Sequence, residues 1–362
     1  MAEALDSLLA RAQARPRNLS VTDLARLVAL DDPDEQRRAR AAAYALKRRT
    51  VGTAVSIRGL VEIGNVCAKD CFYCGIRRSN AAVARYRLTV ADIARMAETC
   101  AREGSASLVL QGGEIESEAN TAFIEDCLRA LAPLNLGITL SLGEQTEEVY
   151  RRWREAGAAR YLLRIETSSP ALYARLHPAT HSWARRAACL DALRRCGYQV
   201  GTGVMSALPG QTAEDLARDI VFFGDRDVDM IGMGPYIPHP DTPLAATAPR
   251  LPPEERLRLG LNMIAATRLY LHDVNIASTT ALQALAPDGR EQGLLAGANV
   301  LMPNVTDVAY RRRYQLYAGK PNLDENADAC RADLDRRLAA LGEHIAYGLR
   351  GDSPHFAARR GD

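Results

Sequence analysis

Three cysteines on one short loop constrain this chain more than any other feature. Cys67, Cys71 and Cys74 stand in the run Cys-Ala-Lys-Asp-Cys-Phe-Tyr-Cys, a CxxxCxxC spacing. Cysteine thiolates are the usual ligands of iron–sulfur clusters. Three of them can bind three irons of a [4Fe–4S] cluster and leave the fourth iron without a protein ligand. At such an open iron, S-adenosylmethionine (SAM) can chelate through its amino and carboxylate groups.

A structural zinc site is the alternative for the same three thiols. Closed zinc sites need four ligands, typically supplied as two close pairs. The next cysteine is Cys100 and the first histidine is His177, so no fourth ligand is near in sequence. A zinc-stabilised binding protein without turnover is therefore the alternative from another functional class, and counting ligands favours the cluster.

Composition excludes several classes of function. The 362 residues are 47% apolar, and 46 basic against 44 acidic side chains give a net charge of +2. This balance is typical of a globular protein and points neither to nucleic acid nor to an anionic membrane. No 18-residue uncharged apolar run and no N-terminal signal pattern is present, so we expect no membrane span and a cytoplasmic location. Eight cysteines without paired spacing are expected as thiols and metal ligands rather than disulfides.

From about residue 55 the chain alternates short β-rich apolar runs with helical segments. Such runs are typical of a parallel sheet whose outer face is covered by helices. Eight of them predict an α/β fold, a closed (βα)8 TIM-type barrel. The expected strands are 56–66, 107–113, 137–143, 160–167, 199–208, 230–237, 275–282 and 298–304.

Extensions on both sides of the barrel give a three-part organisation. Residues 1–50 are expected to form an N-terminal helical extension, a solvated helical face over a barrel end rather than a nucleic-acid surface. The barrel itself is expected over 51–308. A C-terminal extension, 309–362, is expected to contain a helix over 334–349 and a disordered tail of about a dozen residues.

The carboxyl ends of the strands are where a (βα)8 barrel places its active site. Strand two ends in Gly112-Gly113-Glu114, where two glycines let the backbone come close to a ligand and a carboxylate follows. Ser141, at the end of strand three, can hydrogen-bond SAM or a substrate from the wall.

Strand four carries a pair of opposite charges. Alternation puts Arg164 and Glu166 on one face and Ile165 on the other. The pair can be a buried structural ion pair, but such pairs are poor stabilisers, so function explains it better. We expect Glu166 to accept hydrogen bonds from the ribose hydroxyls of SAM. Arg186, in the following helix, can pair with the SAM carboxylate through its guanidinium.

The later strands end in smaller polar groups. Thr279 and Thr280 end strand seven and Met302 ends strand eight, so we expect all three near the reaction partner. His239 and Asp241 lie in a proline-rich loop, where they either face the cavity or serve only the turn.

Two of these motifs resemble the radical SAM superfamily. Tyr73 precedes the last cysteine of the loop, as an aromatic residue commonly does in that superfamily. The Gly-Gly-Glu at 112–114 resembles the motif that binds the amino group of SAM. The resemblance thus implies Tyr73, Gly112, Gly113 and Glu114 as cofactor-binding residues.

A longer set of segments resembles the FeFe-hydrogenase maturase family HydE, over roughly residues 50–325. The set is NVCAKDCFYCGIRR, LQGGE, TLSLGE, RYLLRIET, ALPGQT, GPYIPHPDTPLA, STTALQALAPDGRE, GANVLMPN and YQLYAGK. Biotin synthase and methylornithine synthase share the early motifs. The resemblance implies an enzyme that cleaves SAM and adds the deoxyadenosyl radical to sulfur. The substrate that it implies is a cysteine-bound iron complex carrying CO and cyanide, a precursor in hydrogenase assembly.

The same resemblance implies cofactors and partners. The cofactors would be one [4Fe–4S] cluster and SAM, and the substrate a small or organometallic molecule. An electron donor such as reduced flavodoxin or ferredoxin is implied, with other hydrogenase maturases as further partners.

The chain departs from the family at two places. The family usually has histidine where Ile165 follows the strand-four arginine, and the cysteines of an accessory cluster are reduced here to Cys330. We therefore expect a single cluster. The alternative substrate is a small amino acid, as in methylornithine synthase, or a thioether metabolite.

Overall fold

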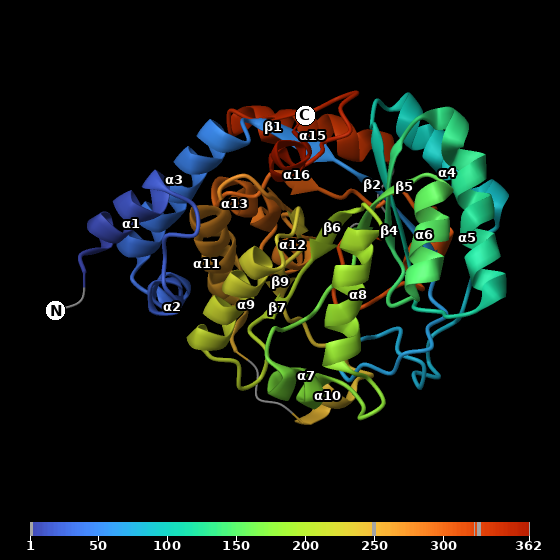
Figure 1. The fold of residues 1–362 in the computed structure, drawn as a ribbon, viewed down its shortest axis with the longest axis horizontal. Helices are drawn as coiled ribbons and strands as arrows, with labels where there is room; N and C mark the ends of the chain where they lie inside the picture. The colour runs from blue at the N-terminus through green and yellow to red at the C-terminus, as the bar shows by residue number, and fades with distance from the viewer. Residues whose placement is uncertain (1–2, 248–250, 322, 324–326, 362) are drawn as a thin grey trace.

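A parallel β-barrel forms the centre of the molecule (Figure 1). The computed structural model describes residues 3–247, 251–321, 323 and 327–361. Seven strands hydrogen-bond in the order β10-β8-β6-β5-β4-β3-β2, and all their pairings are parallel. Parallel bridges of Leu60 with Asn304 and of Ala277 with Val300 join the last strand to both edges and close the ring. The predicted (βα)8 TIM-type fold is confirmed.

Each expected strand is present, and three of them are interrupted. The first, fifth and sixth expected strands each split into two pieces, β1 and β2, β6 and β7, β8 and β9. At Gly203 and Gly232 two backbones come so close that a Cβ on Gly203 would lie 1.9 Å from the Gly232 oxygen. The strands are β1 Ala54–Ile57, β2 Gly59–Gly64, β3 Ser107–Gly112, β4 Gly137–Ser141, β5 Ala158–Leu162, β6 Gln199–Thr202, β7 Met205–Ser206, β8 Met230–Ile231, β9 Gly234–Pro235, β10 Asn275–Ile276 and β11 Val300–Leu301.

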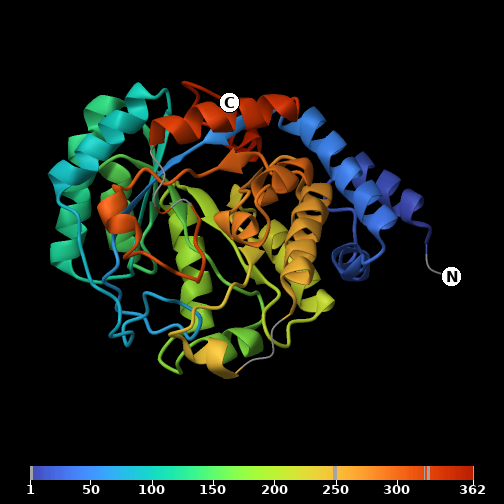
Figure 2. The ribbon, with the colours of Figure 1, turned by 180° about the vertical axis from the view of Figure 1, so that it is seen from behind.

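Helices cover the outside of the barrel (Figures 1 and 2). The helix after the cysteine loop begins at a capping box between Thr89 and Asp92, which satisfies backbone N–H groups at its first turn. Trp153 of α6 stacks on Tyr161 of β5 at 6.4 Å, and both side chains are fully buried. The helices are α4 Val90–Arg102, α5 Glu118–Leu131, η1 Ala132–Leu134, α6 Glu147–Glu155, α7 Pro170–Leu176, α8 Trp183–Arg195, α9 Ala213–Asp225, α10 Pro243–Thr247, α11 Pro253–Leu271, α12 Thr280–Leu285, α13 Gly289–Leu295 and α14 Val308–Arg311.

Three N-terminal helices pack against the flank of the barrel. They are α1 Leu5–Ala14, α2 Val21–Ala29 and α3 Pro33–Thr50. The helix α2 lies on α9, and α3 lies on α11. The extension therefore covers helices at the side of the barrel, whereas the sequence had suggested that it covers a barrel end. Among the described residues, no helix is both long and apolar enough to cross a membrane.

The C-terminal extension differs from its prediction in two ways. Its helix α15, Ala327–Ala340, ends before the expected boundary because the chain turns at Gly342, which has φ 74°. The next residues form β12, His344–Ile345, parallel to β1. The tail that we expected to be disordered forms α16, Pro354–Arg360, held by ion pairs of His355 and Arg359 with Asp227.

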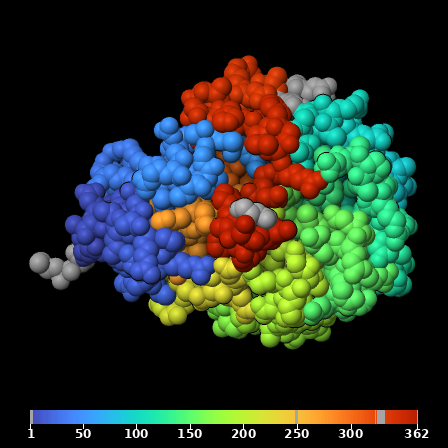
Figure 3. Space-filling model, turned by 45° about the horizontal axis from the view of Figure 1, so that its top comes forward, coloured from blue at the N-terminus to red at the C-terminus, as the bar shows by residue number. Residues whose placement is uncertain are grey.

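The segment before α16 closes the amino-terminal end of the barrel. Arg58 and Arg160 are buried there, and a buried charge is costly without partners. Arg58 donates to the Gly351 oxygen at 3.1 Å, while Arg160 donates to the Arg350 oxygen at 2.7 Å and pairs with Asp352. Figure 3 shows the last residues spread over this end of the molecule. The tail therefore seals the base opposite the strand ends.

We expect Asp352→Ala to lower the free energy of unfolding by about 1.5 kcal/mol, because Arg160 loses a charged partner that is itself half exposed. Partial burial alone would raise the pKa of Asp352, but the charges and hydrogen bonds of its neighbours outweigh burial and lower it. The carboxylate thus stabilises the fold at pH values above its unfolded pKa of about 4. The difference in free energy of unfolding between the parent and Asp352→Ala should shrink as the pH falls below that value. Denaturant unfolding at several pH values measures this effect. Asp31→Ala, an exposed surface change, is the control, and equal stabilities of the parent and Asp352→Ala at pH 7 would contradict the prediction.

Candidate functional site

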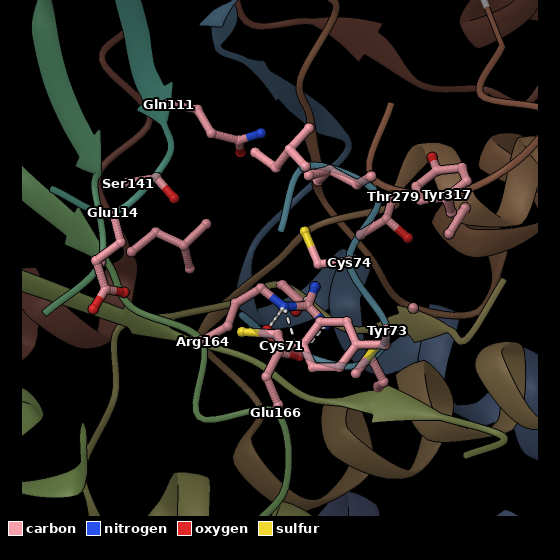
Figure 4. Close-up of a pocket in the computed structure, with 18 of the residues that line it drawn as sticks. Cys71, Tyr73, Cys74, Gln111, Glu114, Ser141, Arg164, Glu166, Thr279 and Tyr317 are labelled. Atoms are coloured by element: carbon pink, nitrogen blue, oxygen red, sulfur yellow. Dashed lines mark hydrogen bonds and ion pairs between the residues drawn. The ribbon is translucent and has the colours of Figure 1, made fainter. Parts of the chain in front are cut away.

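The carboxyl ends of the strands open into a cavity of about 340 Å³ (Figure 4). Its wall contains the thiols of the loop, the ends of β3–β5 and the segments after β9, β10 and β11. Fourteen candidate residues from the sequence lie in this wall, namely Cys67, Cys71, Tyr73, Cys74, Gly112, Gly113, Glu114, Ser141, Arg164, Glu166, Arg186, Thr279, Thr280 and Met302.

The cysteine loop packs directly on the end of β3. A Cβ on Gly113 would lie 2.1 Å from the Val66 oxygen, so only glycine allows this contact. The Glu114 N–H points at the Cys67 sulfur at 3.3 Å. On the other side of the loop, a Cβ on Gly75 would meet the Gln315 oxygen at 2.2 Å. The loop is therefore held between β3 and the segment after β11.

The partly buried thiols are poor ligands until a metal ion binds them. Burial, and next the neighbouring Cys67, raise the pKa of Cys74 to about 12. Burial also raises the pKa of Cys71 and Cys67. A bound metal reverses this balance because it stabilises the thiolate form.

Two histidines come close to the loop, although none is near in sequence. Among the described residues, ligand atoms of Cys71, His177 and His181 lie within 4.8 Å of one another. Both nitrogens of His177 are engaged, Nδ1 with the Tyr173 oxygen at 2.9 Å and Nε2 with the Tyr73 hydroxyl at 3.3 Å. Burial lowers the pKa of His177 to about 3, so it is neutral. This histidine therefore orients Tyr73 rather than supplying a free metal ligand.

Four charges form a network beside the loop. Glu114 and Glu144 each pair with both Lys69 and Arg186, at distances of 3.0–3.3 Å. Burial would raise the pKa of Glu144, but Arg186 and Lys69 outweigh it and hold that pKa below its usual value. The two acids and two bases balance, which is how a buried charged group is tolerated. Lys69 and Glu144 were not predicted as site residues, although both lie next to predicted ones.

Two atoms of this network have hydrogen-bonding capacity left. The Glu114 Oε1 accepts no well-aligned hydrogen bond among the described residues, although the Lys69 Nζ lies 3.0 Å away. Arg186 donates from Nε to the Arg164 oxygen and from Nη1 to the two carboxylates. Its Nη2 has no partner among the described residues. An ammonium and a carboxylate on one ligand would satisfy both atoms.

Arg164 and Glu166 face the cavity together, as the alternation predicted (Figure 4). Arg164 donates to both oxygens of Glu166 at 3.0–3.2 Å and to the oxygens of Gly232 and Val204. Glu166 has φ 68°, so its backbone is strained. The turn after Glu166 is held by Asp219, which accepts from the Ser168 N–H at 2.6 Å and whose burial raises its pKa to about 7.

The opposite wall carries hydroxyl groups and one further ion pair. The Thr280 hydroxyl lies 2.8 Å from the Tyr317 hydroxyl, and Thr279 donates to the Met233 oxygen at 3.3 Å. Lys320 pairs with Glu62 on β2, and both residues line the cavity. Sequence reasoning missed Tyr317, Lys320 and Glu62. Only for Glu62 did the sequence offer a signal, because an acidic residue stands there within an apolar strand.

Two other sequence positions lie away from the cavity. Ile165 is fully buried in the apolar layer outside the barrel, with Ala187 and Val204. His239 packs against Gly75, and its Nδ1 accepts from the Asp241 N–H at 3.2 Å. Neither His239 nor Asp241 lines the cavity, so the structure supports the turn interpretation of this pair. The side chain of Cys330 lies outside the described residues.

Comparison with known proteins agrees with this site. The sequence profile of the radical SAM superfamily matches residues 61–223. The [FeFe] hydrogenase maturase subunit HydE of Thermotoga maritima is 44% identical over 82% of this chain and 83% of its own length.

Two solved structures show the same fold. Methylornithine synthase has a TM-score of 0.79 and 23% identity, covering 94% of this chain and 98% of its own. The maturase HydG of Carboxydothermus hydrogenoformans has a TM-score of 0.80 and 18% identity, covering 98% of this chain and 82% of its own.

The superfamily implies a [4Fe–4S] cluster and SAM, and the three thiols, the Glu114 carboxylate and the Arg186 guanidinium are the groups that such cofactors need. Together with the identity shared over most of both chains, this places the chain in the radical SAM superfamily, as an enzyme of the [FeFe] hydrogenase maturase HydE family.

Proposed function

We propose that this enzyme cleaves SAM and acts on a sulfur-ligated iron–CO–cyanide precursor during assembly of the hydrogenase cluster. The observation that carries the proposal is that three loop thiols line the same cavity as Arg164 and Glu166. The 44% identity to a HydE subunit supports the substrate class. We also propose a cytoplasmic location, because buried thiols and a cluster survive best where the surroundings are reducing.

The thiols suit a cluster better than a lone zinc ion. Ligands of one zinc lie about 2.3 Å from it, so their sulfurs are about 4 Å apart. Among the described residues, the three sulfurs form no group whose members are all within 4.8 Å of one another. This wider spacing is consistent with one [4Fe–4S] cluster on Cys67, Cys71 and Cys74. When bound, the cluster would supply the electron that cleaves SAM to a 5′-deoxyadenosyl radical.

Each polar group of SAM has a complementary residue in the wall. Glu114 can accept from its ammonium, and Arg186 can donate to its carboxylate from Nη2. Glu166 lines the same cavity, and its remaining lone pairs suit ribose hydroxyls. Ser141, beside them on β4, offers a further hydroxyl.

The rest of the cavity suits the substrate. Thr279, Thr280, Met302 and Tyr317 form a wall of hydroxyl and thioether groups, and the cations Arg164 and Lys320 line the same cavity. In the proposed step a C5′–S bond forms and the unpaired electron passes to the iron, which is reduced by one electron. Ile165 stands where the family usually has histidine. Because this side chain lies in the apolar layer outside the barrel, the substitution leaves the wall of the cavity unaltered. A small amino acid as substrate has no specific feature of the wall in its favour.

We expect Cys67→Ala, Cys71→Ala and Cys74→Ala each to abolish the cluster, because two thiolates hold it poorly. Anaerobic reconstitution should give about four irons and four sulfides per parent chain and almost none in the variants, by iron and sulfide analysis. Cys196→Ala, a cysteine outside the cavity, is the matched control. Tight zinc in the parent without SAM-dependent 5′-deoxyadenosine would sink the proposal.

Arg186→Ala should weaken SAM binding about 10- to 100-fold, the cost of one charge-assisted hydrogen bond. Equilibrium binding of SAM to the reconstituted protein measures it. Arg195→Ala, on the same helix α8, is the control, since Arg195 is exposed and pairs with Glu147 outside the cavity. Unchanged affinity in Arg186→Ala would exclude its contact with the carboxylate.

Incubation with a cysteine-bound iron–CO–cyanide complex, SAM and reductant should give a sulfur-adenosylated product by mass spectrometry. Arg164→Lys should lower its yield at least tenfold, because a lysine cannot reproduce the forked contacts to Glu166 and two carbonyls. Clean turnover of an amino acid, with only uncoupled 5′-deoxyadenosine from the iron complex, would contradict the proposed substrate.

A further inference from the structure

The positive charge of this chain is concentrated around the cysteine loop. Residues 65–88 carry five basic side chains and one acidic, and residues 309–320 carry four basic and none acidic. These two segments are therefore net +8, whereas the whole chain is net +2, so the remainder is net −6. Such an asymmetry creates a local field that steers an oppositely charged partner.

The two segments lie side by side in the fold. The Asn65 side chain donates to the Arg313 oxygen at 2.7 Å, and the Gly75 N–H donates to the Leu316 oxygen at 2.9 Å. Arg85 ties the loop together by donating to the Asn65 and Arg78 oxygens. Figure 2 shows the loop at one end of the molecule, far from the N-terminal helices.

Part of this charge is used inside the protein and part faces outward. Lys69 and Lys320 pair with buried acids, and Arg77 pairs with Asp70. Three arginines, Arg78, Arg87 and Arg313, are exposed and do not line the cavity. None of these three has an ion-pair partner among the described residues, although Arg87 donates to the Asn120 side chain at 3.0 Å and lies over the Phe123 ring.

Arg78 and Arg87 belong to the segment that carries the thiols, and Arg313 belongs to the segment beside it. The Arg78 N–H bonds the Lys69 oxygen and the Arg77 N–H bonds the Cys74 oxygen, so these residues are one turn of chain from the ligands. Val66, next to Cys67, is 43% exposed and gives this surface an apolar centre. A charged rim around an apolar centre is typical of a protein-docking surface.

We propose that this face, centred on Val66 and rimmed by Arg78, Arg87 and Arg313, docks an acidic one-electron carrier protein. The inference rests on the proposed function, which requires one electron per SAM cleaved. The carrier is oxidised by one electron and the loop's cluster is reduced by one, with no atom transferred. A carrier bound here approaches the thiols from outside, while SAM and substrate occupy the cavity.

The test compares two reductants on the reconstituted enzyme and on Arg78→Glu/Arg313→Glu. Stopped-flow absorbance follows cluster reduction by a reduced flavodoxin, an acidic protein, and by photoreduced 5-deazariboflavin, a small uncharged molecule. Arg37→Glu on α3, an exposed arginine away from the loop, is the matched control.

At about 0.01 M salt, the double variant should react with flavodoxin at least about tenfold more slowly than the parent and the control. At about 1 M salt the three proteins should react alike, because the charges are screened. Reduction by deazariboflavin should be the same in all three. Equal rates with flavodoxin at low salt would overturn the docking surface, as would an equal slowing with both reductants.

The two proposals fail in different ways. If deazariboflavin reduces the parent and SAM is still not cleaved, the proposed function is wrong. If SAM is cleaved but flavodoxin reduces parent and double variant equally fast, only the docking surface is wrong.

Discussion

The backbone contact between Gly113 and the Val66–Cys67 peptide is the constraint on which the site depends. Because no side chain fits between them, the cysteine loop sits directly on the end of β3. That contact brings the Glu114 N–H to the Cys67 sulfur and the Glu114 carboxylate to Lys69. One glycine thus sets the distance between the groups expected to hold the cluster and those expected to hold SAM.

The electrostatics of the cavity follow from this placement. Two acids and two bases are brought together with little water, and each charge is tolerated because opposite charges surround it. The amino and carboxylate groups of SAM also cancel, so its binding would leave the balance of the network unchanged. The pair of Arg164 with Glu166 is a second pairing of opposite charges in the cavity wall, on a backbone fixed by Asp219.

The sequence predicted what local patterns encode. Short apolar runs alternating with helical segments located the barrel, and the rule that parallel strands end at one rim gathered fourteen residues into one cavity. It missed Tyr317 and Lys320, because their segment has no periodicity and reaches the cavity only through long-range contacts such as Lys320 with Glu62. It missed the folded tail because Arg58 and Arg160 are paired largely with backbone oxygens, which leave no pattern in the sequence. The approach of His177 to Cys71 also left no pattern in the sequence, because the two residues are far apart along the chain.

The central claim is that three thiolates leave one iron open to SAM. Mössbauer spectroscopy of protein reconstituted with ⁵⁷Fe tests it most directly. Adding SAM should change the signal of one iron in four, while Cys67, Cys71 and Cys74 keep the other three unchanged. Four irons that stay equivalent after SAM is added would contradict the account, because a fourth protein ligand, such as His181, would then occupy the open position.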